Sequence, residues 1–388
     1  MRGKTIVPAI RFAGFTDAWV QRRVREVADR YDNLRIPVAA NLRIPGNTPY
    51  YGANGIQDYV DGFTHDGEFV LVAEDGANDL KNYPVKCVKG RIWVNNHAHV
   101  IQGKSDVCDN QFMAYCISQS DIESLLVGGG RAKLNAEILM DIVLTLPSLK
   151  EQAIIGSYLN ILDRLITFHQ CKYSRLCNIK KSMLERMFPK EGASVPEIRF
   201  AGFTDVWERR KLGELTTEFI EYITLSSELP LLTSSRAGLM YQNEYRGNLT
   251  TDSKETLFSV VPLGACTYRH MSDDDIFHLN INILEKGLVS REYPVFIATG
   301  ENDLNFIVQH LNSDSKFRAF CAEQKKGGTR TRLYYKTLCE FSVMVPKSAE
   351  QNKISSLLLG IDHLITLHQR KLERLQNIKK SCLEKMFV

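Results

Sequence analysis

Few residues in this chain have the types and spacing that catalysis requires. Gly103-Lys104-Ser105 resembles the end of a phosphate-binding loop, but Ala98 stands where that loop needs its leading glycine. Asp252-Ser253-Lys254 and Asp314-Ser315-Lys316 resemble the tail of a nuclease carboxylate motif, yet neither has a convincing acidic partner upstream. The Asn/Asp-Pro-Pro-aromatic segment and the glycine-rich cofactor loop of an amino-methyltransferase are also missing. The sequence therefore predicts that the chain is not an enzyme.

Histidines and cysteines are the next residues that could do chemistry. His97 and His99 alternate on a predicted strand and would share one face, which allows metal binding, although a structural role is favoured. His169 and His368 fall on helical seams, where a role in pairing register is favoured over catalysis. The nine cysteines form no CxxC pairs and are odd in number, which argues against a disulfide framework and a structural zinc site. No metal site is predicted.

Basic, aromatic and amide side chains that could contact DNA gather in two regions. Arginine can bind guanine through two hydrogen bonds, and Tyr, Asn and Gln can meet bases or backbone oxygens. The alternative for each such residue is a solvated surface position. The candidates are Tyr50, Tyr51, Asn54, Asn95, Asn96, His97, Arg131 and Lys133 in the first region, and Arg236, Arg246, Tyr268, Arg269, Arg291, Lys325, Lys326, Arg330 and Arg332 in the second.

Two glycine-rich segments with basic residues occur at a constant offset of 199 residues: 128–134 reads GGGRAKL and 327–333 reads GGTRTRL. Glycines let a backbone approach a ligand closely, and the alternating basic residues could then bind phosphate. The other interpretation is a surface turn that leads into a strand. Recurrence at matching places in otherwise dissimilar regions slightly favours phosphate binding.

The elements that must position these residues are also duplicated. Residues 146–189 and 345–388 align at the same offset, with about half of the positions identical. Apolar residues alternate there in steps of four and three from Ile155 and from Ile354, which is the seam of a coiled coil. Pro147 and Pro346 precede the seams and suit a helix start. The sequence therefore predicts two long amphipathic helices.

An additional apolar row widens each predicted helical stripe beyond a two-helix seam. It comprises Tyr158, Leu165, Leu184 and Phe188, matched by Leu357, Leu364, Leu383 and Phe387. Each helical stretch has a net charge of +4, as does the whole chain, so the remainder is net acidic. We hypothesise that the apolar row and its basic flanks form a docking surface for a partner, and that any binding of a polyanion depends on local patches.

A second repeat sets the domain organisation. Residues 8–22, PAIRFAGFTDAWVQR, recur as 196–210, PEIRFAGFTDVWERR. The expected divisions are a repeat motif at 1–23, a variable domain at 24–145, a long helix at 146–189, a linker with the second motif at 190–211, a second variable domain at 212–344 and a second long helix at 345–388. In the first variable domain, 84–101 reads as hairpin strands with turns at Lys89-Gly90 and Asn95-Asn96, and 46–60 as a loop.

Composition limits the remaining classes. With 388 residues, 44% hydrophobic and 24% charged, the chain resembles an ordinary globular protein of two or three domains. No apolar run approaches a membrane span, and the N-terminal stretch lacks the apolar core of a signal peptide. The expected location is the cytoplasm.

These features together resemble the specificity subunit of type I restriction-modification systems. The resemblance rests on the paired RFAGFTD-x-W motifs, on helices that open with P-x-x-x-E-Q and carry NIKKS-x-LE-x-MF, and on PYYGANGIQDYV, LVAEDG and GRIWVNNHAHV in the first variable domain. It implies an α+β protein in which two α/β target recognition domains are separated by two long antiparallel coiled-coil helices, as a pseudo-twofold tandem repeat.

The resemblance also implies a function and partners. Each domain is expected to read one half of a bipartite target in double-stranded DNA, while the helices set the spacing and dock two methyltransferase subunits. Adenine methylation and ATP-driven cleavage belong to partner chains, including any restriction subunits. S-adenosylmethionine, ATP and Mg are therefore expected only there, with no cofactor in this chain.

Two alternatives stay open from the residues alone. One is a single-chain DNA methyltransferase or nuclease with built-in specificity, which needs the cofactor loop or carboxylate set missing above. The other is a coiled-coil assembly protein that does not bind DNA.

Overall fold

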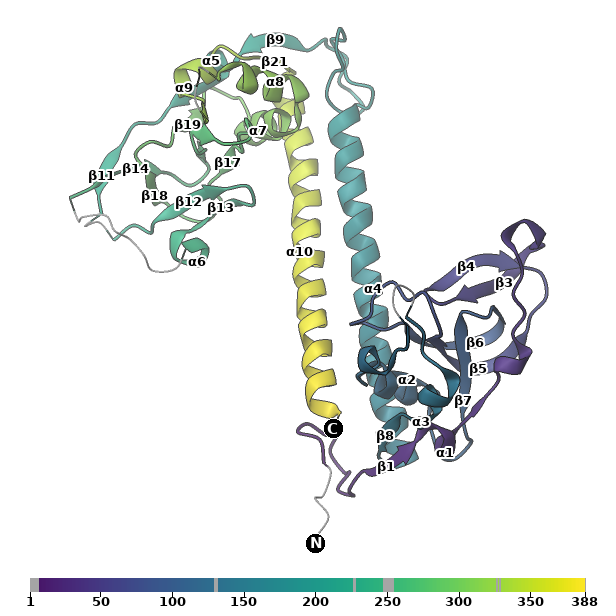
Figure 1. Ribbon diagram of the computed structural model, residues 1–388. Helices are drawn as coiled ribbons and strands as arrows, with labels where there is room; N and C mark the ends of the chain where they lie inside the picture. Colours follow the sequence, from purple (N-terminus) through teal and green to yellow (C-terminus); the bar gives the residue numbers. More distant parts are fainter. Residues whose placement is uncertain are drawn as a thin grey trace. The chain divides into compact units, whose positions relative to one another are not determined.

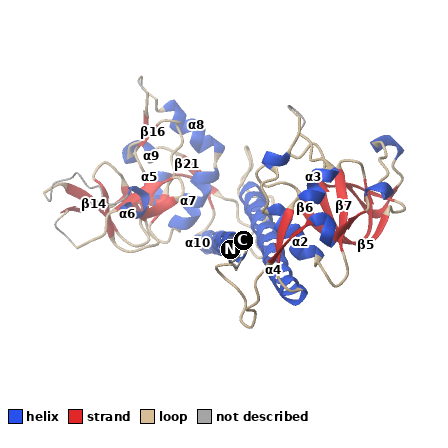
Figure 2. Cartoon of the chain, turned by 60° about the horizontal axis from the view of Figure 1, so that its bottom comes forward, coloured by secondary structure: helices blue, strands red, loops and turns tan. Residues whose placement is uncertain are grey.

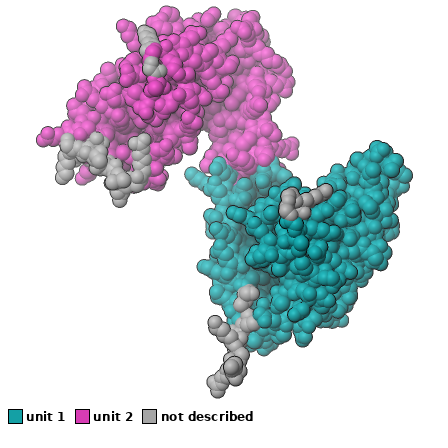
Figure 3. Space-filling view, in the orientation of Figure 1, with its two compact units in different colours: residues 1–171, 369–388 teal, residues 172–368 magenta. Residues whose placement is uncertain are grey.

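The protein forms two compact units, residues 1–171 with 369–388 and residues 172–368 (Figure 3). The computed structural model describes residues 7–128, 132–225, 228–246, 255–325, 327 and 329–387. Each unit contains one of the two variable regions and part of each long helix.

The duplicated stretches form unbroken helices, α4 (Leu149–Arg186) and α10 (Ser348–Met386) (Figure 1). In the first unit the opening turns of α4 share a hydrophobic cluster with Met386 at the end of α10. In the second unit Met187, just after α4, shares a cluster with Ile354 in the opening turns of α10. The start of one helix thus packs with the end of the other inside each unit, which confirms the predicted antiparallel pairing.

The predicted seam is the least exposed face of both helices. Ile155 and Leu159 in α4, and Ile354 and Leu358 in α10, are almost fully buried. Leu162 and Ile361, the next seam positions, are also buried, and the seam positions in the middle of each helix are half-buried, whereas many of their neighbours on the opposite face are exposed. A step of four and three keeps one face toward the partner helix along the whole length, so the heptad pattern accounts for this burial.

The first unit is built around a six-stranded sheet with the order β2-β7-β5-β6-β3-β4. All neighbours are antiparallel except β3 and β6, which are parallel. Helix α2 contributes six buried residues to the main core of the unit, which it shares with α4. The elements are β1 (Val20–Arg23), α1 (Val24–Val27), β2 (Ala28–Arg30), β3 (Pro45–Gly52), β4 (Gly55–Val60), β5 (His65–Ala73), β6 (Val85–Val94), β7 (Ala98–Gly103), α2 (Asn110–Ser118), α3 (Ala136–Asp141) and β8 (Val143–Leu146).

The second unit contains several small antiparallel sheets in place of one large one (Figure 2). They are β10-β19-β15-β17, β11-β14-β18, β12-β13, β16-β20 and β9-β21. The elements are β9 (Glu208–Lys211), α5 (Leu212–Leu215), β10 (Thr216–Glu218), β11 (Tyr222–Thr224), β12 (Leu232–Ser235), β13 (Gly238–Tyr241), α6 (Gln242–Arg246), β14 (Leu257–Val261), β15 (Cys266–Thr267), β16 (Met271–Ser272), β17 (Asn280–Ile281), β18 (Gly287–Ser290), β19 (Val295–Ala298), α7 (Leu304–Ser313), α8 (Ser315–Glu323), β20 (Thr331–Arg332), α9 (Tyr335–Leu338) and β21 (Ser342–Val345).

A short strand pair joins each repeat motif to its long helix. β1, which begins in the last residues of the first motif, pairs with β8 immediately before α4, and Val20 lies opposite Leu146. β9, which begins in the last residues of the second motif, pairs with β21 immediately before α10, and Glu208 lies opposite Val345. The registers correspond at the repeat offsets. The mixed α/β domains and the two long helices thus confirm the predicted fold class.

Two local predictions in the first unit need correction. β6 and β7 exist, and Asn95-Asn96 lies between them, but they do not form a hairpin because both pair with β5. Lys89-Gly90 lies inside β6, so it is not a turn. The stretch expected to be a loop is the β3-β4 hairpin, whose turn is Ala53-Asn54.

Candidate nucleic-acid interface

A buried ion pair holds each repeat motif to the first turn of a long helix. Arg11 donates from Nε and Nη2 to the two carboxylate oxygens of Glu151, both at 2.7 Å. Arg199 makes the same two bonds to Glu350, also at 2.7 Å. The side chains of Glu151 and Glu350 are 0% and 1% exposed. The carboxylate raises the pKa of each arginine further above its ordinary value, chiefly through these hydrogen bonds.

The neighbouring glutamine orients the helix of each variable domain. Gln152 accepts from the backbone N–H of Asp109 at 3.0 Å and donates to the carbonyl of Pro147. Asp109 in turn caps α2 by accepting from the N–H of Phe112 at 2.8 Å. Gln351 and Asp303 repeat this arrangement at the start of α7. The duplicated Glu-Gln pair therefore fixes the variable domain on its helix.

Polar pins tie the two long helices to each other and to a domain helix. In the first unit Lys379 lies 2.5 Å from Asp163, which also accepts from the Tyr115 hydroxyl at 2.6 Å. In the second unit Lys180 lies 2.7 Å from Asp362, which also accepts from Gln309 at 2.8 Å. Burial, followed by the bond to Asp163, raises the pKa of Tyr115.

The sequence contains a signal for these two ion pairs, because both their aspartates and their lysines recur in the aligned helical repeats. Asp163 and Asp362 are identical in the aligned repeats, and both lysines occupy apolar seam positions. A charged residue on such a seam needs a partner, because an unpaired buried charge is costly. The side chains that link helices and domains were nevertheless not among the predicted functional residues.

An aromatic cluster closes the other end of each helix. Phe387, after α10, stacks on Phe112 with ring centroids 5.5 Å apart. Phe188, after α4, lies 5.3 Å from Phe306. The motif tryptophans Trp19 and Trp207 make edge contacts with Phe112 and Phe306 respectively. The Met-Phe end of each helical repeat thus packs under the domain that belongs to the other repeat.

Burial corrects the expectation that three residues of the first unit contact DNA. Tyr50 is 1% exposed, and its hydroxyl accepts from the Val38 N–H at 2.9 Å while Arg43 lies 4.1 Å over its ring. Tyr51 packs in a hydrophobic cluster with side chains of β5, β6 and β7, and burial there raises its pKa. Asn95 is buried and accepts from the His97 N–H at 2.8 Å. These side chains support the loops and do not present a surface.

Four other predicted residues of the first unit gather around the loop that follows β5. Asn54 donates to the carbonyl of Gly76 at 2.8 Å and accepts from Asn78 N–H at 2.9 Å. His97, beside the exposed Asn96, lies 2.6 Å from Asp75, and Lys133 lies 2.7 Å from Glu74. The pKa of Lys133 is raised, chiefly by the hydrogen bond to Glu74. We call Asn54, Asn96, His97 and Lys133 the first polar patch; Arg131 lies outside the described residues.

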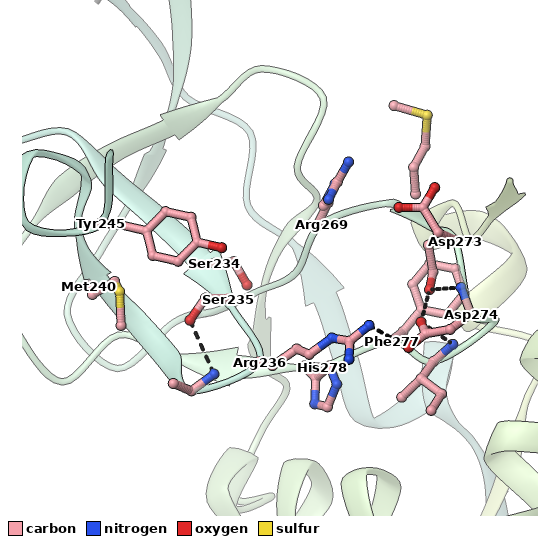
Figure 4. A pocket seen from close by; sticks show the side chains of 14 residues that line it. Ser234, Ser235, Arg236, Met240, Tyr245, Arg269, Asp273, Asp274, Phe277 and His278 are labelled. Atoms are coloured by element: carbon pink, nitrogen blue, oxygen red, sulfur yellow. Dashed lines mark hydrogen bonds and ion pairs between the residues drawn. The ribbon is translucent and has the colours of Figure 1, made fainter. Parts of the chain in front are cut away.

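In the second unit, Arg236 and Arg269 line a pocket of about 300 Å³ together with Tyr245 and His278 (Figure 4). Arg236 occupies the turn of the β12-β13 hairpin, and its guanidinium lies 2.5 Å from Asp274. Desolvation lowers the pKa of His278, so this imidazole is neutral at neutral pH. The pocket therefore combines arginines and carboxylates, two kinds of group that can read base edges, with an imidazole.

The other exposed candidates of the second unit lie in different places. Arg330 lies 2.7 Å from Asp273 and Lys325 lies 3.6 Å from Asp275, next to the pocket. Arg332 is exposed on β20, and Arg291 lies 5.2 Å over the ring of Tyr222 at another sheet.

Tyr268 is fully buried and donates to the Leu333 carbonyl at 3.2 Å, so its predicted DNA contact is corrected to a core role. Lys326 and the side chain of Arg246 lie outside the described residues.

The two glycine-rich segments lie partly outside the described residues, at 129–131 and at 328. Their described parts form short bridges: Lys133 pairs with Asp75 and Val127, and β20 pairs with β16. Among the described basic residues of the segments, Lys133 and Arg330 are bound to carboxylates of their own unit, whereas Arg332 is exposed on β20. The surface-turn interpretation accounts for these bridges, and phosphate binding stays a prediction.

The residues with possible catalytic roles have structural contacts. His99 lies between the carboxylate of Asp32, at 2.8 Å, and the carbonyl of Leu134, at 2.9 Å. Asp314 caps α8, and Lys104 donates to the carbonyls of Arg25 and Glu26. Among the described residues no group of three or more His, Cys, Asp or Glu side chains could hold a metal ion. Residues 252–254 lie outside the described part of the chain.

None of the described helices is both long enough and apolar enough to cross a membrane. The exposed apolar side chains of the long helices include Ile161, Leu165 and Phe168 in α4 and Leu364 and Leu367 in α10.

Comparisons with known proteins give three findings. A family model described as "Type I restriction modification DNA specificity domain" matches residues 16–177 and 280–377. A putative type I restriction enzyme specificity subunit of Haemophilus influenzae is 45% identical over 140 residues, which cover 36% of this chain and 36% of that relative. The aligned part therefore spans about a third of the relative's length. The crystal structure of a type I restriction-modification S subunit from M. genitalium has the same fold, with a TM-score of 0.68 at 12% identity over 99% of both chains.

Proposed function

Because this chain belongs to the family of type I restriction-modification DNA specificity domains, we propose that it is the specificity subunit of such a system. Each variable domain reads one half of a bipartite target in double-stranded DNA. The observation that carries this proposal is duplication of the scaffold without duplication of the domains. Gln152 accepts from the backbone of Asp109 and Gln351 from that of Asp303, so equivalent contacts hold two differently built domains on their helices. Equivalent attachment of two different recognition domains suits a DNA target with two different half-sites.

Each domain supplies polar groups that match this task. The first polar patch offers amide, imidazole and ammonium groups around one loop, and Arg236 and Arg269 offer guanidinium groups at the pocket of the second unit. Arginine binds guanine through two hydrogen bonds, asparagine binds adenine in the same way, and lysine binds phosphate. Both domains can therefore combine base contacts with backbone contacts.

The helix pair sets the spacing between the two half-sites. α4 has 38 residues and α10 has 39. At ~1.5 Å per residue each helix is ~57 Å long, which is more than one and a half turns of B-DNA at ~34 Å per turn. A spacer of this stiffness leaves the bases between the half-sites unread.

The long helices also dock two methyltransferase subunits, one for each repeat. Five of the eight side chains in the predicted apolar row do not serve this purpose, because Leu184 and Phe188 pack inside the second unit and Tyr158, Leu383 and Phe387 inside the first. Leu165 remains 40% exposed and its counterpart Leu364 42% exposed.

One turn further along each helix, Phe168 and Leu367 are also exposed. These two matched pairs give each repeat an equivalent apolar contact for one copy of the same partner.

The reactions belong to the partner subunits. Methylation there uses S-adenosylmethionine, and cleavage by any restriction subunit uses ATP and Mg. The proposed role of this chain is to bind DNA and to position those subunits, so it needs no cofactor of its own.

A binding experiment separates this proposal from its two rivals. The purified chain, alone and with its methyltransferase partner, is titrated onto a 40-base-pair duplex over a series of salt concentrations. Phosphate contacts make affinity fall steeply with salt, with a slope near −0.9 per contact. An assembly protein that does not bind DNA would show no salt-dependent shift. Methyl transfer or magnesium-dependent cleavage by the chain alone would instead support a single-chain enzyme.

A further inference from the structure

An acidic loop faces the basic residues that the second recognition domain would use on DNA. Asp273, Asp274 and Asp275 follow β16. Each carboxylate is paired with a different cation: Asp273 with Arg330 at 2.7 Å, Asp274 with Arg236 at 2.5 Å and Asp275 with Lys325 at 3.6 Å. Three of the predicted DNA contacts are therefore already bound to anions of their own domain.

Other contacts within the domain fix the positions of two of the three carboxylates. The Ser272 hydroxyl donates to Asp274 at 2.7 Å, and this bond is the largest cause of the lowered pKa of Asp274. Asp275 adopts a φ of 62°, a left-handed conformation that aspartate tolerates better than most residues, and it accepts from the Thr331 hydroxyl. The loop thus holds its carboxylates against cations from two other segments: Arg236 between β12 and β13, and Lys325 and Arg330 between α8 and β20.

The first recognition domain also pairs loop carboxylates with candidate DNA contacts, although the paired cations do not stand at matching sequence offsets. Glu74 and Asp75 align with Asp273 and Asp274 at 199 residues. Glu74 binds Lys133 at 2.7 Å, and Asp75 binds His97 at 2.6 Å. In both domains an acidic loop therefore occupies side chains that belong to the candidate DNA surface.

We propose that Asp273, Asp274 and Asp275 are specificity-determining residues that compete with DNA phosphates for Arg236, Lys325 and Arg330. The acidic loop weakens binding to any duplex by keeping these cations engaged. Only a duplex that also forms base contacts in the pocket compensates for breaking the three ion pairs. This inference rests on the proposed function, because it assumes that the second domain binds DNA.

The ion pairs are solvent-exposed, so each is worth little alone. An exposed pair shifts an equilibrium by roughly twofold, and three such pairs together shift it by about tenfold. Each cation released from a carboxylate to a phosphate also steepens the salt dependence of binding by about 0.9 in the log-log slope.

The test uses the full chain with a triple variant, Asp273→Asn, Asp274→Asn and Asp275→Asn. Its affinity for a fluorescent 30-base-pair duplex of mixed sequence should rise about tenfold, with a steeper salt slope. The matched control is Asp205→Asn, Glu221→Gln and Glu340→Gln, which changes the charge equally. It releases Lys347, Lys286 and Lys211 from exposed pairs elsewhere in the same unit. An equal rise in both triple variants, or no rise in the first, would overturn the inference.

A single substitution keeps the proposal testable if the triple variant does not fold. The only described bond of the Asp273 side chain is the one to Arg330, so Asp273→Asn should leave the fold intact and raise mixed-duplex affinity by about twofold. The duplex that carries the mapped methylation target is titrated in parallel. If wild type shows no preference for that target, the proposed function fails; if it shows the preference but the Asn variants bind mixed duplex no more tightly, only the competition fails.

Discussion

Replacing Arg199 by methionine should destabilise the second unit strongly, because it leaves a buried carboxylate without its cation. The side chain of Glu350 is 1% exposed and has both oxygens bound to Arg199 at 2.7 Å. Removing one partner of a buried ion pair costs about 3–5 kcal/mol. Arg199 itself is 15% exposed, so water can partly solvate the orphaned carboxylate. We therefore expect a loss of about 3 kcal/mol, at the lower end of that range.

The assay is urea unfolding followed by circular dichroism, with hydrogen exchange to assign the loss to the second unit. The double variant Arg199→Met, Glu350→Leu removes the charge with its partner, and we expect it to recover most of the stability, because apolar replacements of buried pairs are often neutral. The control Lys211→Met breaks the exposed pair with Glu340 and should cost less than about 1 kcal/mol. Equal losses in Arg199→Met and Lys211→Met would refute the reasoning, as would a double variant no more stable than the single one.

Three further predictions concern the helices, the domains and a buried histidine. Inserting one heptad into both helices, after Cys171 and after His368, should lengthen each by ~10 Å and widen the gap between half-sites by about three base pairs; altered half-sites with an unaltered gap in the methylation map would contradict the spacer. Exchanging residues 212–344 for another recognition domain should change one half of the target only, and a change in both halves would exclude independent reading. Burial lowers the pKa of His310 to about 4 from 6.5, so the unfolded chain binds a proton that the folded chain does not and stability falls as pH drops below 6.5. His310→Phe, which can keep the stacking on Phe188, should therefore remove about 2 kcal/mol of the loss measured between pH 7 and pH 5 in urea; an unchanged pH dependence would assign the loss to other groups.

The long helices were predictable because their determinants are local and repeated. The steps of four and three place Ile155, Leu159 and Leu162 on one buried face, and proline precedes each helix. The duplicated Glu-Gln pair at each helix start was visible in the sequence as well. Its role was not, because the partners Arg11 and Arg199 lie 140 and 151 residues away.

The domains were less predictable because their strands pair out of chain order. β6 and β7 are consecutive in the sequence, which predicts a hairpin. In the sheet, however, β5 lies between them and pairs with both. Tyr50 has the type of a DNA contact, yet its burial depends on the backbone of Val38 and on Arg43. Such contacts are set by packing after the sheet forms, which residue type and spacing do not specify.

The candidate surface shows the same limit in its electrostatics. Arg236 and Arg330 were predicted from their type, and the structure places both near one pocket. Their partners Asp274 and Asp273 lie 38 and 57 residues away in the sequence. A basic residue in a sequence therefore indicates a possible phosphate contact, but only the fold shows whether a carboxylate already holds it.

Mapping methylated adenines across the genome, in cells with and without this chain, tests the central claim most directly. The account predicts one bipartite motif, with two short half-sites and a fixed unread gap, whose methylation is lost when the chain is removed and regained when it is restored. A methylation pattern that does not change with the chain, or a dependent motif that is continuous and has no gap, would contradict it.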